Sequence, residues 1–381
     1  MMSRLEELIK ELCPNGVKFD QLNTVLDYEQ PTKYIVNKTD YDDSFKTPVL
    51  TAGQSFILGY TNEVDDIYNA TKETPTIIFD DFTTSFHWVD FNFKIKSSAM
   101  KILRIKPDKL EDTLLRYVYH CMKSIQYEPV DHSRQWIAKY SNFRIPLPHI
   151  EVQREIVRIL DNFTELTAEL TAELTARKKQ YEYYNKYMFN FNNDIKFFKL
   201  SDIADIGTGS SNTNEQLEVG DYPFFVRSQE IRRKNEYEFD ETAIITSGDG
   251  VGVGKIFHFV TGKYALHQRA YRIHIKSPKV IPKYFYYYMK NTFYEYILRS
   301  AFNSSVTSIR RPMLNNYMVP IPYPNDSAKS LAEQQRIVGI LDRFDTICND
   351  ITQGLPSEIE ARQKQYEYYR NKLLTFKEKK I

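Results

Sequence analysis

The sequence predicts an α+β protein with two mixed α/β domains and two long helical regions that pack antiparallel like a coiled coil, related by an internal pseudo-twofold duplication. The duplication is the first observation. Residues 156–163 return at 337–344 with six of eight positions identical, and residues 177–184 return at 362–369 with seven of eight. The second observation is a set of short alternating apolar runs between the copies, which predicts strands. The third is an uninterrupted four-residue leucine repeat, which predicts a long helix.

The duplication also predicts the domain map. Each half opens with a similar apolar segment, continues through short strands to a late helix and closes with alternating prolines. A duplicated scaffold of this kind suits a protein that holds two different recognition modules at a fixed distance. We expect a first mixed domain with an N-terminal helix (1–148), a first helical spacer (149–194), a second mixed domain (195–322) and a second helical spacer (323–381).

Local patterns predict the elements of the two mixed domains. Runs rich in β-branched and aromatic residues indicate strands at 76–79, 101–105, 243–246 and 270–275, and late helices are expected at 111–122 and 282–298. The alternating prolines at 145–148 and 319–322 cannot remain in a central strand or a helix. Each therefore predicts a stiff, extended exit that sets the direction of the following helix.

The first helical region carries the leucine repeat, Leu166, Leu170 and Leu174, within a Thr-Ala-Glu-Leu tandem. Four residues advance about 400°, so these side chains form one slowly drifting apolar stripe. No Gly or Pro interrupts residues 151–190, which predicts a helix roughly 60 Å long at about 1.5 Å per residue. Such a length argues for packing against another long helix.

The second helical region is expected to be broken. Its sequence is interrupted at Gly354-Leu-Pro356, where a helix cannot continue. Ser357 and Glu360 then have the spacing of a capping box, so we expect a second helix to begin there.

Composition indicates an ordinary soluble protein in a reducing compartment. The 381 residues are 42% hydrophobic and 27% charged, and no apolar run approaches a membrane span. The N-terminal ten residues mix acidic and basic side chains, unlike a signal peptide. Cys13, Cys121 and Cys348 lie far apart without a CxxC pair, which favours the cytoplasm over a disulfide scaffold or a zinc site.

Charge is distributed unevenly around a net value of +1. The four expected segments carry −3, −2, +5 and +1 in chain order. The chain as a whole is therefore not a polycation. If it binds nucleic acid, attraction to phosphates must come from local patches or from a partner.

No catalytic, cofactor or metal constellation is expected. The Gly-rich segment 247–255 lacks the phosphate-loop pattern, because Asp249 stands five residues before Gly254 and Ile256 follows Lys255. We expect a tight hairpin there, or a backbone that approaches a DNA phosphate closely. The seven histidines show no HxxxH or HExxH spacing, and no nucleophile elbow is present. This pattern favours a binding role.

Polar loops rich in hydrogen-bond donors are the remaining functional candidates. Arg pairs with guanine and Gln or Asn with adenine at base edges, whereas Ser and Thr more often hold phosphates. Such loops can also be plain solvated surface, but they occur at comparable places in both halves. The candidate DNA-binding residues are Thr51, Gln54, His132, Ser133, Arg134, Gln135, Trp136, Arg227, Ser228, Gln229, Arg232, Ser247, His267, Gln268, Arg269, Ser305, Thr307, Ser308, Arg310 and Arg311.

The repeated helical blocks carry a second set of candidates, which either pack the two helical regions together or dock a partner protein. Both readings stay open, because the aromatic side chains point to more than one helix face. These residues are Leu166, Leu170, Leu174, Tyr181, Tyr184, Tyr366 and Tyr369.

Taken together, these motifs resemble the specificity subunit of type I restriction–modification systems. The resemblance covers the full chain. It rests on the opener at 3–16, the two Ile-Val-x-Ile-Leu-Asp-x-Phe helix starts, the Thr-Ala-Glu-Leu tandem and the two Gln-Tyr-Glu-Tyr-Tyr blocks.

The resemblance implies a non-catalytic protein with two target recognition domains, each reading one half of a split sequence in double-stranded DNA. It implies that the helices set the spacer and dock two methyltransferase subunits. Two restriction–translocation subunits would complete a cytoplasmic host-defence complex. S-adenosylmethionine and ATP are expected on those partners, and no cofactor on this chain. The base-reading residues differ between members of this family, so the loop candidates rest on side-chain chemistry alone.

Two alternatives remain at this stage. The chain could be a DNA-modifying or nucleotide-hydrolysing enzyme, which predicts binding of S-adenosylmethionine or ATP by the pure protein. It could also be a structural coiled-coil organiser without a DNA role, which predicts no sequence-specific footprint.

Overall fold

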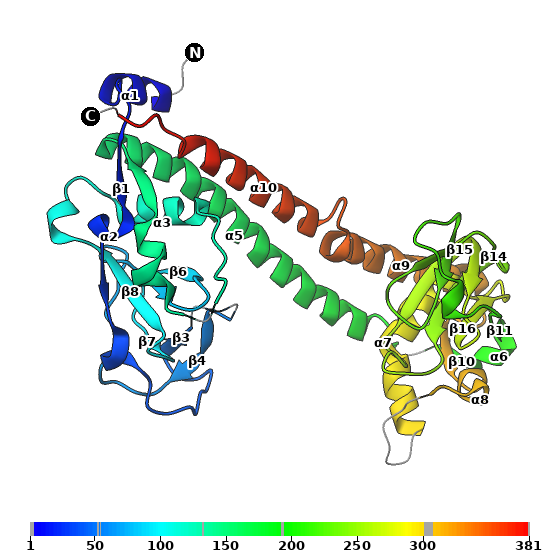
Figure 1. Ribbon diagram of the computed structural model, residues 1–381. Coiled ribbons are helices and arrows are strands. Elements are labelled where there is room, and N and C mark those ends of the chain that lie inside the picture. Colours follow the sequence, from blue (N-terminus) through cyan, green and yellow to red (C-terminus); the bar gives the residue numbers. More distant parts are fainter. Residues whose placement is uncertain are drawn as a thin grey trace. The chain divides into compact units, whose positions relative to one another are not determined.

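The structure is a computed structural model that describes residues 4–51, 53, 55–131, 133–191, 194–300 and 308–379. The chain forms two compact units (Figure 1). Unit 1 comprises Met1–Glu169 and Ile359–Ile381, and unit 2 comprises Leu170–Glu358. The predicted α+β class with two mixed domains and long helical regions is confirmed. The unit boundaries fall within the helical regions, so each unit combines a mixed domain with parts of both helical copies; the four-segment map remains a prediction.

Unit 1 is built from short strands and helices that precede a long helix. Its helices are α1 (Arg4–Leu12), α2 (Leu22–Val25), α3 (Leu115–Ser124), α4 (Gln135–Ala138) and the first part of α5 (Ile150–Tyr187), with 3-10 turns η1 (Pro31–Tyr34), η2 (Pro107–Lys109) and η3 (Tyr140–Asn142). Its strands are β1 (Lys18–Gln21), β2 (Leu26–Glu29), β3 (Thr47–Leu50), β4 (Ile57–Thr61), β5 (Thr76–Asp80), β6 (Phe86–Val89), β7 (Lys94–Ile95), β8 (Met100–Ile105) and β9 (Arg144–Leu147).

Two sheets and a helix form the layers of unit 1. The four-stranded sheet has the order β2-β8-β5-β6, and the three-stranded sheet has the order β4-β3-β7. Alternation along β5 sends Ile77 and Phe79 into the core that contains α3, and Ile78 into the core shared with the smaller sheet. The predicted strands at 76–79 and 101–105 are confirmed as β5 and β8, and the predicted helix at 111–122 is α3.

Unit 2 has a similar plan with longer strands. Its strands are β10 (Ile195–Lys199), β11 (Ala204–Thr208), β12 (Tyr222–Phe225), β13 (Arg232–Lys234), β14 (Phe239–Ser247), β15 (Phe257–Leu266), β16 (Ala270–Ile275) and β17 (Met318–Pro322). Its helices are α6 (Leu200–Ile203), α7 (Pro282–Ser300), α8 (Arg311–Asn315), α9 (Ser327–Asn349) and the 3-10 turn η4 (Thr213–Glu215). Helix α10 (Leu355–Leu373) begins in unit 2 and ends in unit 1.

One six-stranded sheet, of order β11-β16-β14-β15-β12-β13, forms the centre of unit 2. It is continuous because β15 pairs with β14 along its length and with β12 at its end. Ile244 and Ile273 face the core that contains α7, whereas Ala243 and Ile245 face a smaller core on the opposite side. The predicted strands at 243–246 and 270–275 and the predicted helix at 282–298 are confirmed as parts of β14, β16 and α7.

The proline-rich exits are strands of two-stranded ladders. β9 pairs antiparallel with β1, where Pro146 lies opposite Phe19, and β17 pairs with β10, where Pro320 lies opposite Phe197. A proline lacks an N–H but is compatible with an edge position. The extended conformation was predicted, but the pairing of each opener with its own exit was not, because the partners lie more than a hundred residues apart in the sequence.

The helical regions agree with the prediction from the sequence, except for the residue at which α10 begins. Helix α5 spans 38 residues without a break, as predicted. The second region is interrupted, also as predicted, between α9 and α10. The capping box predicted at Ser357 is wrong: α10 begins at Leu355, and the Ser357 hydroxyl donates to the carbonyl of Thr352 at 3.4 Å. Pro356 fits the first turn of this helix, where its missing N–H costs nothing.

Each unit packs the start of one helical copy against the aromatic block of the other. In unit 1, the ring of Phe163 stacks on Tyr369 with centroids 5.3 Å apart. In unit 2, Phe344 stacks on Tyr181 at 5.9 Å and lies against Tyr184 at 5.2 Å. Phe163 and Phe344 occupy the same position of the repeated motif, so the duplicated sequence makes the same contact twice.

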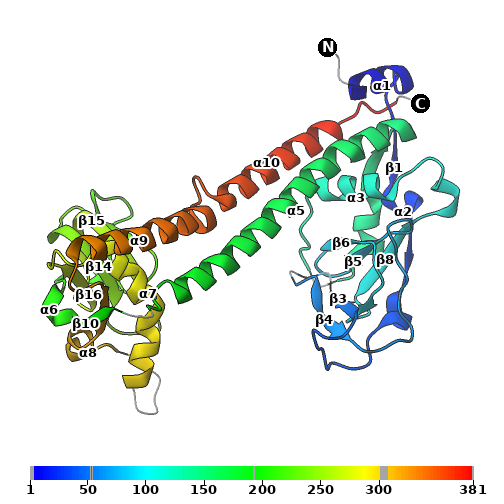
Figure 2. The same cartoon turned by 180° about the vertical axis from the view of Figure 1, so that it is seen from behind.

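Described segments near the two ends of the chain meet within unit 1. Figure 2 shows α1 beside the C-terminal segment, as Figure 1 does from the opposite side. Val17 forms a parallel bridge with Glu378, accepting from Lys379 N and donating to Lys377 O, each at 2.9 Å. Gly16 has φ +91° and lies so close to the Lys377 carbonyl that a side chain would not fit. The Cys13-Pro-Asn-Gly16 turn is thus adapted to receive the C-terminal segment.

Candidate nucleic-acid interface

Four turns of unit 2 meet at one end of its central strands, and we call this region the unit 2 loop edge. They follow β12 (226–231), follow β14 (248–256), connect β15 to β16 (267–269) and precede α8 (308–310). Main-chain hydrogen bonds join them: His267 N donates to Phe225 O at 2.9 Å, Gly248 N to Arg269 O at 2.9 Å, and Ile309 N to Gly248 O at 2.8 Å. These bonds fix the turns beside one another irrespective of the side chains that they display.

A carboxylate joins two arginines on the unit 2 loop edge. Arg227 donates to one oxygen of Asp249 at 2.6 Å, and Arg269 donates to the other at 3.2 Å. The two arginine side chains are 40% and 61% exposed, and Asp249 is 27% exposed. Partial burial raises the pKa of the Asp249 carboxyl, but the hydrogen bonds and positive charges of the arginines outweigh it and hold that pKa below its ordinary value. The carboxylate therefore stays charged and holds both guanidinium groups.

Two buried side chains support this cluster from below. The hydroxyl of Ser247 donates to the Asp249 carbonyl at 2.8 Å and fixes the turn. The Nδ1 atom of His267 accepts from Arg269 N at 3.0 Å. Burial lowers the pKa of the His267 imidazole, and the charge of Arg227 lowers it further. A neutral imidazole is required for this contact, since only the neutral ring has an acceptor nitrogen.

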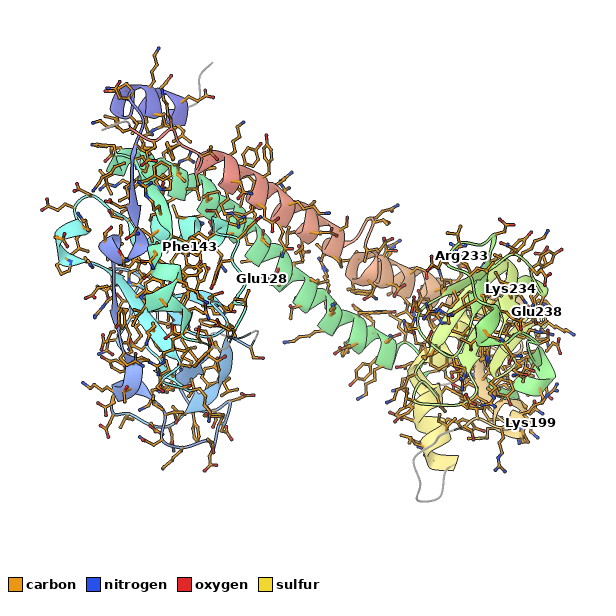
Figure 3. All side chains as sticks on the ribbon, viewed as in Figure 1. Glu128, Phe143, Lys199, Arg233, Lys234 and Glu238 are labelled. Atoms are coloured by element: carbon orange, nitrogen blue, oxygen red, sulfur yellow. The ribbon has the colours of Figure 1, made fainter. Side chains whose placement is uncertain are left out.

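The turn at 211–215 adjoins these four turns as a fifth part of the loop edge and is held by a polar cluster. Gln268 N donates to Ser211 O at 2.9 Å. Lys234 Nζ donates to Ser211 Oγ at 2.9 Å, and Ser211 Oγ in turn donates to Glu238. Figure 3 shows Lys234 and Glu238 close together on the same side of unit 2. This cluster positions the amides of Asn212 and its neighbours next to Gln268.

Arg227 lies between two open hollows of the loop edge. One hollow has a volume of about 410 Å³ and is lined by Thr213, Gln216, Val226, Arg227, Ser228, Arg232, Asp249, Gly250 and Val251. The other also measures about 410 Å³ and is lined by Asn212, Thr213, Asn214, Arg227, His267, Gln268 and Arg269. Both are open to solvent, and the second has a mainly polar lining, so they suit the edges of a large ligand better than an enclosed small molecule.

Unit 1 has an equivalent loop edge. Its described residues are 51, 53, 55 and 56 after β3, 81–85 after β5, 96–99 between β7 and β8, and 131, 133 and 134 before α4. The same three main-chain bonds join them. Lys96 N donates to Leu50 O at 3.0 Å, Asp81 N to Ala99 O at 3.0 Å, and Gln135 N to Asp81 O at 2.7 Å. The two units thus share a backbone arrangement at this edge, while the side chains on it differ.

A buried ion pair stabilises the unit 1 loop edge. The carboxylate of Asp81 lies 3.4 Å from Lys101 Nζ, and both side chains are 1% exposed. The other carboxylate oxygen accepts from Trp136 N at 2.8 Å, which ties the turn before α4 to the end of β5. Lys101 also donates to Gln30 at 2.5 Å. Here the carboxylate binds a buried lysine and the main chain. It does not hold exposed arginines, as Asp249 does in unit 2.

The structure places the candidate DNA-binding residues in three groups. Those with exposed side chains are Ser133, Arg134, Arg227, Gln229, Gln268, Arg269, Ser308, Arg310 and Arg311, and those half-buried are Thr51, Ser228 and Arg232. Those with buried side chains are Gln135, Trp136, Ser247 and His267. Gln54, His132, Ser305 and Thr307 lie outside the described residues.

The buried candidates cannot contact a ligand directly, because their side chains are enclosed by other residues of their own unit. Gln135 accepts from Tyr127 OH at 2.7 Å and donates to Ser133 O at 2.7 Å, so its amide is used within unit 1. Trp136 packs between Phe79 and Tyr140, with ring centroids 5.0 and 6.1 Å away. The interface proposed below therefore excludes these two side chains, and also those of Ser247 and His267.

Several residues at the loop edges were not selected from the sequence. In unit 2 these include Asp249 and Asn212, and in unit 1 they include Asp81 and Lys96. Asp249 stands between two glycines, which marks a turn but does not show that two distant arginines converge on it. Asp81 follows another aspartate after an apolar run, and nothing local indicates its buried lysine partner.

The helical candidates divide between packing and exposure. Tyr181 is 8% exposed, and Tyr366 accepts or donates a 2.9 Å hydrogen bond with His120. Leu174 packs against the core of unit 2, whereas Leu166 is 44% exposed. Tyr184 and Tyr369 pack on one side only; their exposed fractions are 36% and 39%. Leu170 is half-buried. The aromatic blocks therefore pack the helices and also leave aromatic surface uncovered.

Two further findings concern the described residues. Among them, no group of three or more His, Cys, Asp and Glu side chains is placed to hold a metal ion. No helix in the described part of the chain has the length and apolar character needed to cross a membrane.

Comparison with known proteins gives a consistent result. The family model described as type I restriction modification DNA specificity domain matches twice, at residues 14–177 and 192–361. The chain is 42% identical to the specificity subunit of the type I restriction enzymes EcoR124I and EcoR124II of Escherichia coli, over 98% of both chains. It is 30% identical to a putative type I specificity subunit of Haemophilus influenzae, over 85% of this chain and 86% of the relative.

Solved structures agree at the level of fold. The crystal structure of a type I restriction–modification S subunit from M. genitalium matches with a TM-score of 0.66 at 15% identity, covering 94% of this chain and 96% of that one. The two family matches each contain one loop edge and one copy of the Ile-Val-x-Ile-Leu-Asp-x-Phe motif, so they follow the same duplication. The chain therefore belongs to the family of type I restriction–modification DNA specificity proteins.

Proposed function

We propose that the chain is the DNA-reading subunit of a type I restriction–modification complex and that each unit reads one half of a split target in double-stranded DNA. The observation that carries this proposal is the loop edge, which occurs twice with the same three main-chain bonds. A conserved backbone arrangement that displays different side chains is what two readers of different half-sites require. The duplicated family match supports the same division.

The exposed side chains of the loop edges have the chemistry for this task. Unit 2 presents Arg227, Gln268 and Arg269, which can pair with base edges in the major groove. Unit 1 presents Lys96, Ser133 and Arg134, whose side chains are exposed and suit phosphate contacts. The half-sites are therefore expected to be read by different chemistry, with no catalysis by this chain itself.

Partner subunits supply the remaining activities in this proposal. The chain is expected to assemble with two methyltransferase subunits and two restriction–translocation subunits, which would carry S-adenosylmethionine and ATP. The helices leave Tyr183 and Tyr368 exposed at 57% and 61%, and these rings are suitable contacts for a partner protein. The three cysteines are free and buried, which suits the cytoplasm expected for such a complex.

Family membership favours this function over the two alternatives. A DNA-modifying or nucleotide-hydrolysing enzyme would bind S-adenosylmethionine or ATP as a pure chain. A structural organiser would have no use for two polar loop edges that share a backbone and differ in side chains. A lack of cofactor binding by the pure chain, together with a sequence-specific footprint, would separate the proposed function from both.

Variants confined to one loop edge test the proposal. The complex with its methyltransferase partner would be expressed in a methylation-free host, and methylated motifs would be read by long-read sequencing. Substituting Lys96 and Arg134 with alanine in unit 1 is expected to relax or abolish one half of a split motif. Substituting Arg232 and Gln268 in unit 2 should affect the other half only. A single variant that alters both halves, or a wild-type motif that is not split, would contradict the proposal.

A further inference from the structure

The arginine pair of unit 2 has a feature that ordinary surface arginines lack. Arg227 and Arg269 come from turns 42 residues apart in the sequence, yet both donate to Asp249. Each bond described uses one terminal nitrogen, Nη1, of the guanidinium group. Within the described residues no further hydrogen-bond partner is recorded for either group, so the Nε–Nη2 side of each fork is available to a ligand.

Two ligand chemistries could use such forks: a phosphate oxygen or the O6 and N7 atoms of guanine. The charge of the cluster distinguishes them. Asp249 lies between the arginines and cancels one of their two positive charges. A carboxylate at this position would repel a phosphate, whereas it does not oppose a neutral base edge. It also fixes the orientation of both guanidinium planes, as a bidentate contact requires.

The surroundings of the cluster agree with a base edge. Arg227 borders both 410 Å³ hollows, and Arg269 borders one of them. The neighbouring donors and acceptors in the second hollow include three amides, from Asn212, Asn214 and Gln268. Amides and arginine forks are the side chains that read purines in the major groove. Among the described residues of the unit 1 edge there is no equivalent pair, and its buried Asp81 binds Lys101 and the main chain.

We propose that Arg227 and Arg269 read guanine in the half-site of unit 2 and that Asp249 is the positioning residue that holds both forks for this contact. The inference rests on the proposed function and deepens it: the half-site of unit 2 contains at least one G·C pair whose recognition depends on this cluster.

The experiment uses the complete complex with its methyltransferase partner and compares four variants by methylated-motif sequencing. Arg227→Ala and Arg269→Ala are each expected to relax the motif at a G·C position within one half and to leave the other half unchanged. Arg269→Lys keeps the charge but loses the fork, so it should relax the same position as Arg269→Ala. Asp249→Asn should relax the positions read by both arginines, with a thermal melting temperature close to that of wild type.

Affinity measurements separate a base contact from a phosphate contact. For Arg269→Ala, binding to the wild-type site should fall about 5- to 150-fold, as for loss of one bidentate base contact. Binding to a site changed at that G·C pair should fall far less, and the salt dependence should keep the wild-type slope. The matched control is Arg233→Ala, which removes an exposed arginine of the same unit that lines neither hollow. It should leave the motif unchanged.

Three outcomes would overturn the inference. The first is an unchanged motif in the alanine variants. The second is a uniform loss of affinity with a salt slope reduced by about one, which marks a phosphate contact. The third is a wild-type methylated motif in the Arg269→Lys variant. In each of these cases a split motif in the wild type would still support the proposed function. If the wild-type motif is not split, the proposed function itself fails.

Discussion

Buried polar side chains determine what each loop edge can display. Asp81 in unit 1 and Asp249 in unit 2 both follow a central strand of the sheet. The first is buried with Lys101 and binds the main chain of the next turn, whereas the second is partly exposed and holds two arginines. The shared main-chain bonds align Asp81 with Gly248, so the two carboxylates occupy neighbouring positions on the same backbone, where one is a rigid support and the other holds two exposed arginines.

The buried pair of unit 1 gives a stability prediction. Asp81→Asn removes the negative charge and leaves the buried Lys101 without a charged partner. Breaking a buried ion pair in this way costs about 3–5 kcal/mol. We expect unfolding in urea to show a loss of this size for unit 1. The control is Asp66→Asn, whose partner Lys33 lies 3.8 Å away with both side chains exposed. That pair should contribute no more than about 1 kcal/mol, and equal effects of the two variants would refute the prediction.

Three buried histidines predict a pH dependence of stability. Burial lowers the pKa of His120, His258 and His267 below the ordinary value. The unfolded chain then binds more protons than the folded one once the pH falls below about 6.5. The contribution of these histidines to the free energy of unfolding is therefore fully present above this pH. It is lost as the pH falls toward the folded-state pKa, by up to about 1.4 kcal/mol per pH unit for each histidine.

Urea unfolding at pH 7.5 and pH 5.5 checks this dependence. His120→Gln should reduce the difference between the two pH values, because it removes one of the three titrating groups while an amide can still bind Asp161. His149→Gln, at an exposed position, is the control and should leave the difference unchanged. A wild-type protein that is equally stable at both pH values would contradict the assignment.

At the scale of elements, the leucine tandem gives helix α5 its length. The helix continues without interruption from Ile150 to Tyr187, and the tandem lies inside it. Thr164, Thr167 and Thr175 satisfy their hydroxyls by donating to carbonyls three or four residues earlier in the helix. These threonines therefore do not compete with helix formation, and the four-residue unit can be repeated without disturbing it.

Changing the number of Thr-Ala-Glu-Leu units should change the spacing of the DNA target. One unit adds four residues, or about 6 Å along the helix axis. DNA advances about 3.4 Å per base pair. Deleting residues 171–174, or duplicating them, is expected to change the unspecified spacer by one or two base pairs, about the ratio of these two lengths. Both half-sites should stay the same in the methylated motif. An altered half-site in either variant would show that the tandem does more than set a distance.

Local sequence patterns predicted most helices and several strands, because these elements depend on neighbouring residues. The break between α9 and α10 followed from Gly354 and Pro356 alone. The predicted capping box at Ser357 was wrong, because the Ser-x-x-Glu pattern does not show which residue begins the helix. The pairing of β1 with β9 and of β10 with β17 also could not be predicted, since periodicity within a strand does not identify a distant partner.

For the whole molecule, the weak net charge predicts how DNA binding depends on partners. The chain carries a net charge of only +1, so few counterions would be released when it binds DNA alone. We expect the isolated chain to bind its target weakly, with a salt sensitivity set by the few phosphate contacts that its local patches make. Affinity should rise sharply when the methyltransferase partner is added, because the partner adds phosphate contacts. Fluorescence anisotropy with and without the partner checks this, and equal affinities would contradict it.

The sequence by itself determined the duplication, the α+β class, the long helix and the loops in which functional side chains gather. These properties depend on composition, on local periodicity and on comparison of the chain with itself. Only the tertiary structure decided which loop residues are displayed. It buried Gln135, Trp136, Ser247 and His267, and it brought Arg227 and Arg269 to Asp249. The physical reason is that burial and convergence are set by contacts between segments far apart in the chain, and no local pattern records them.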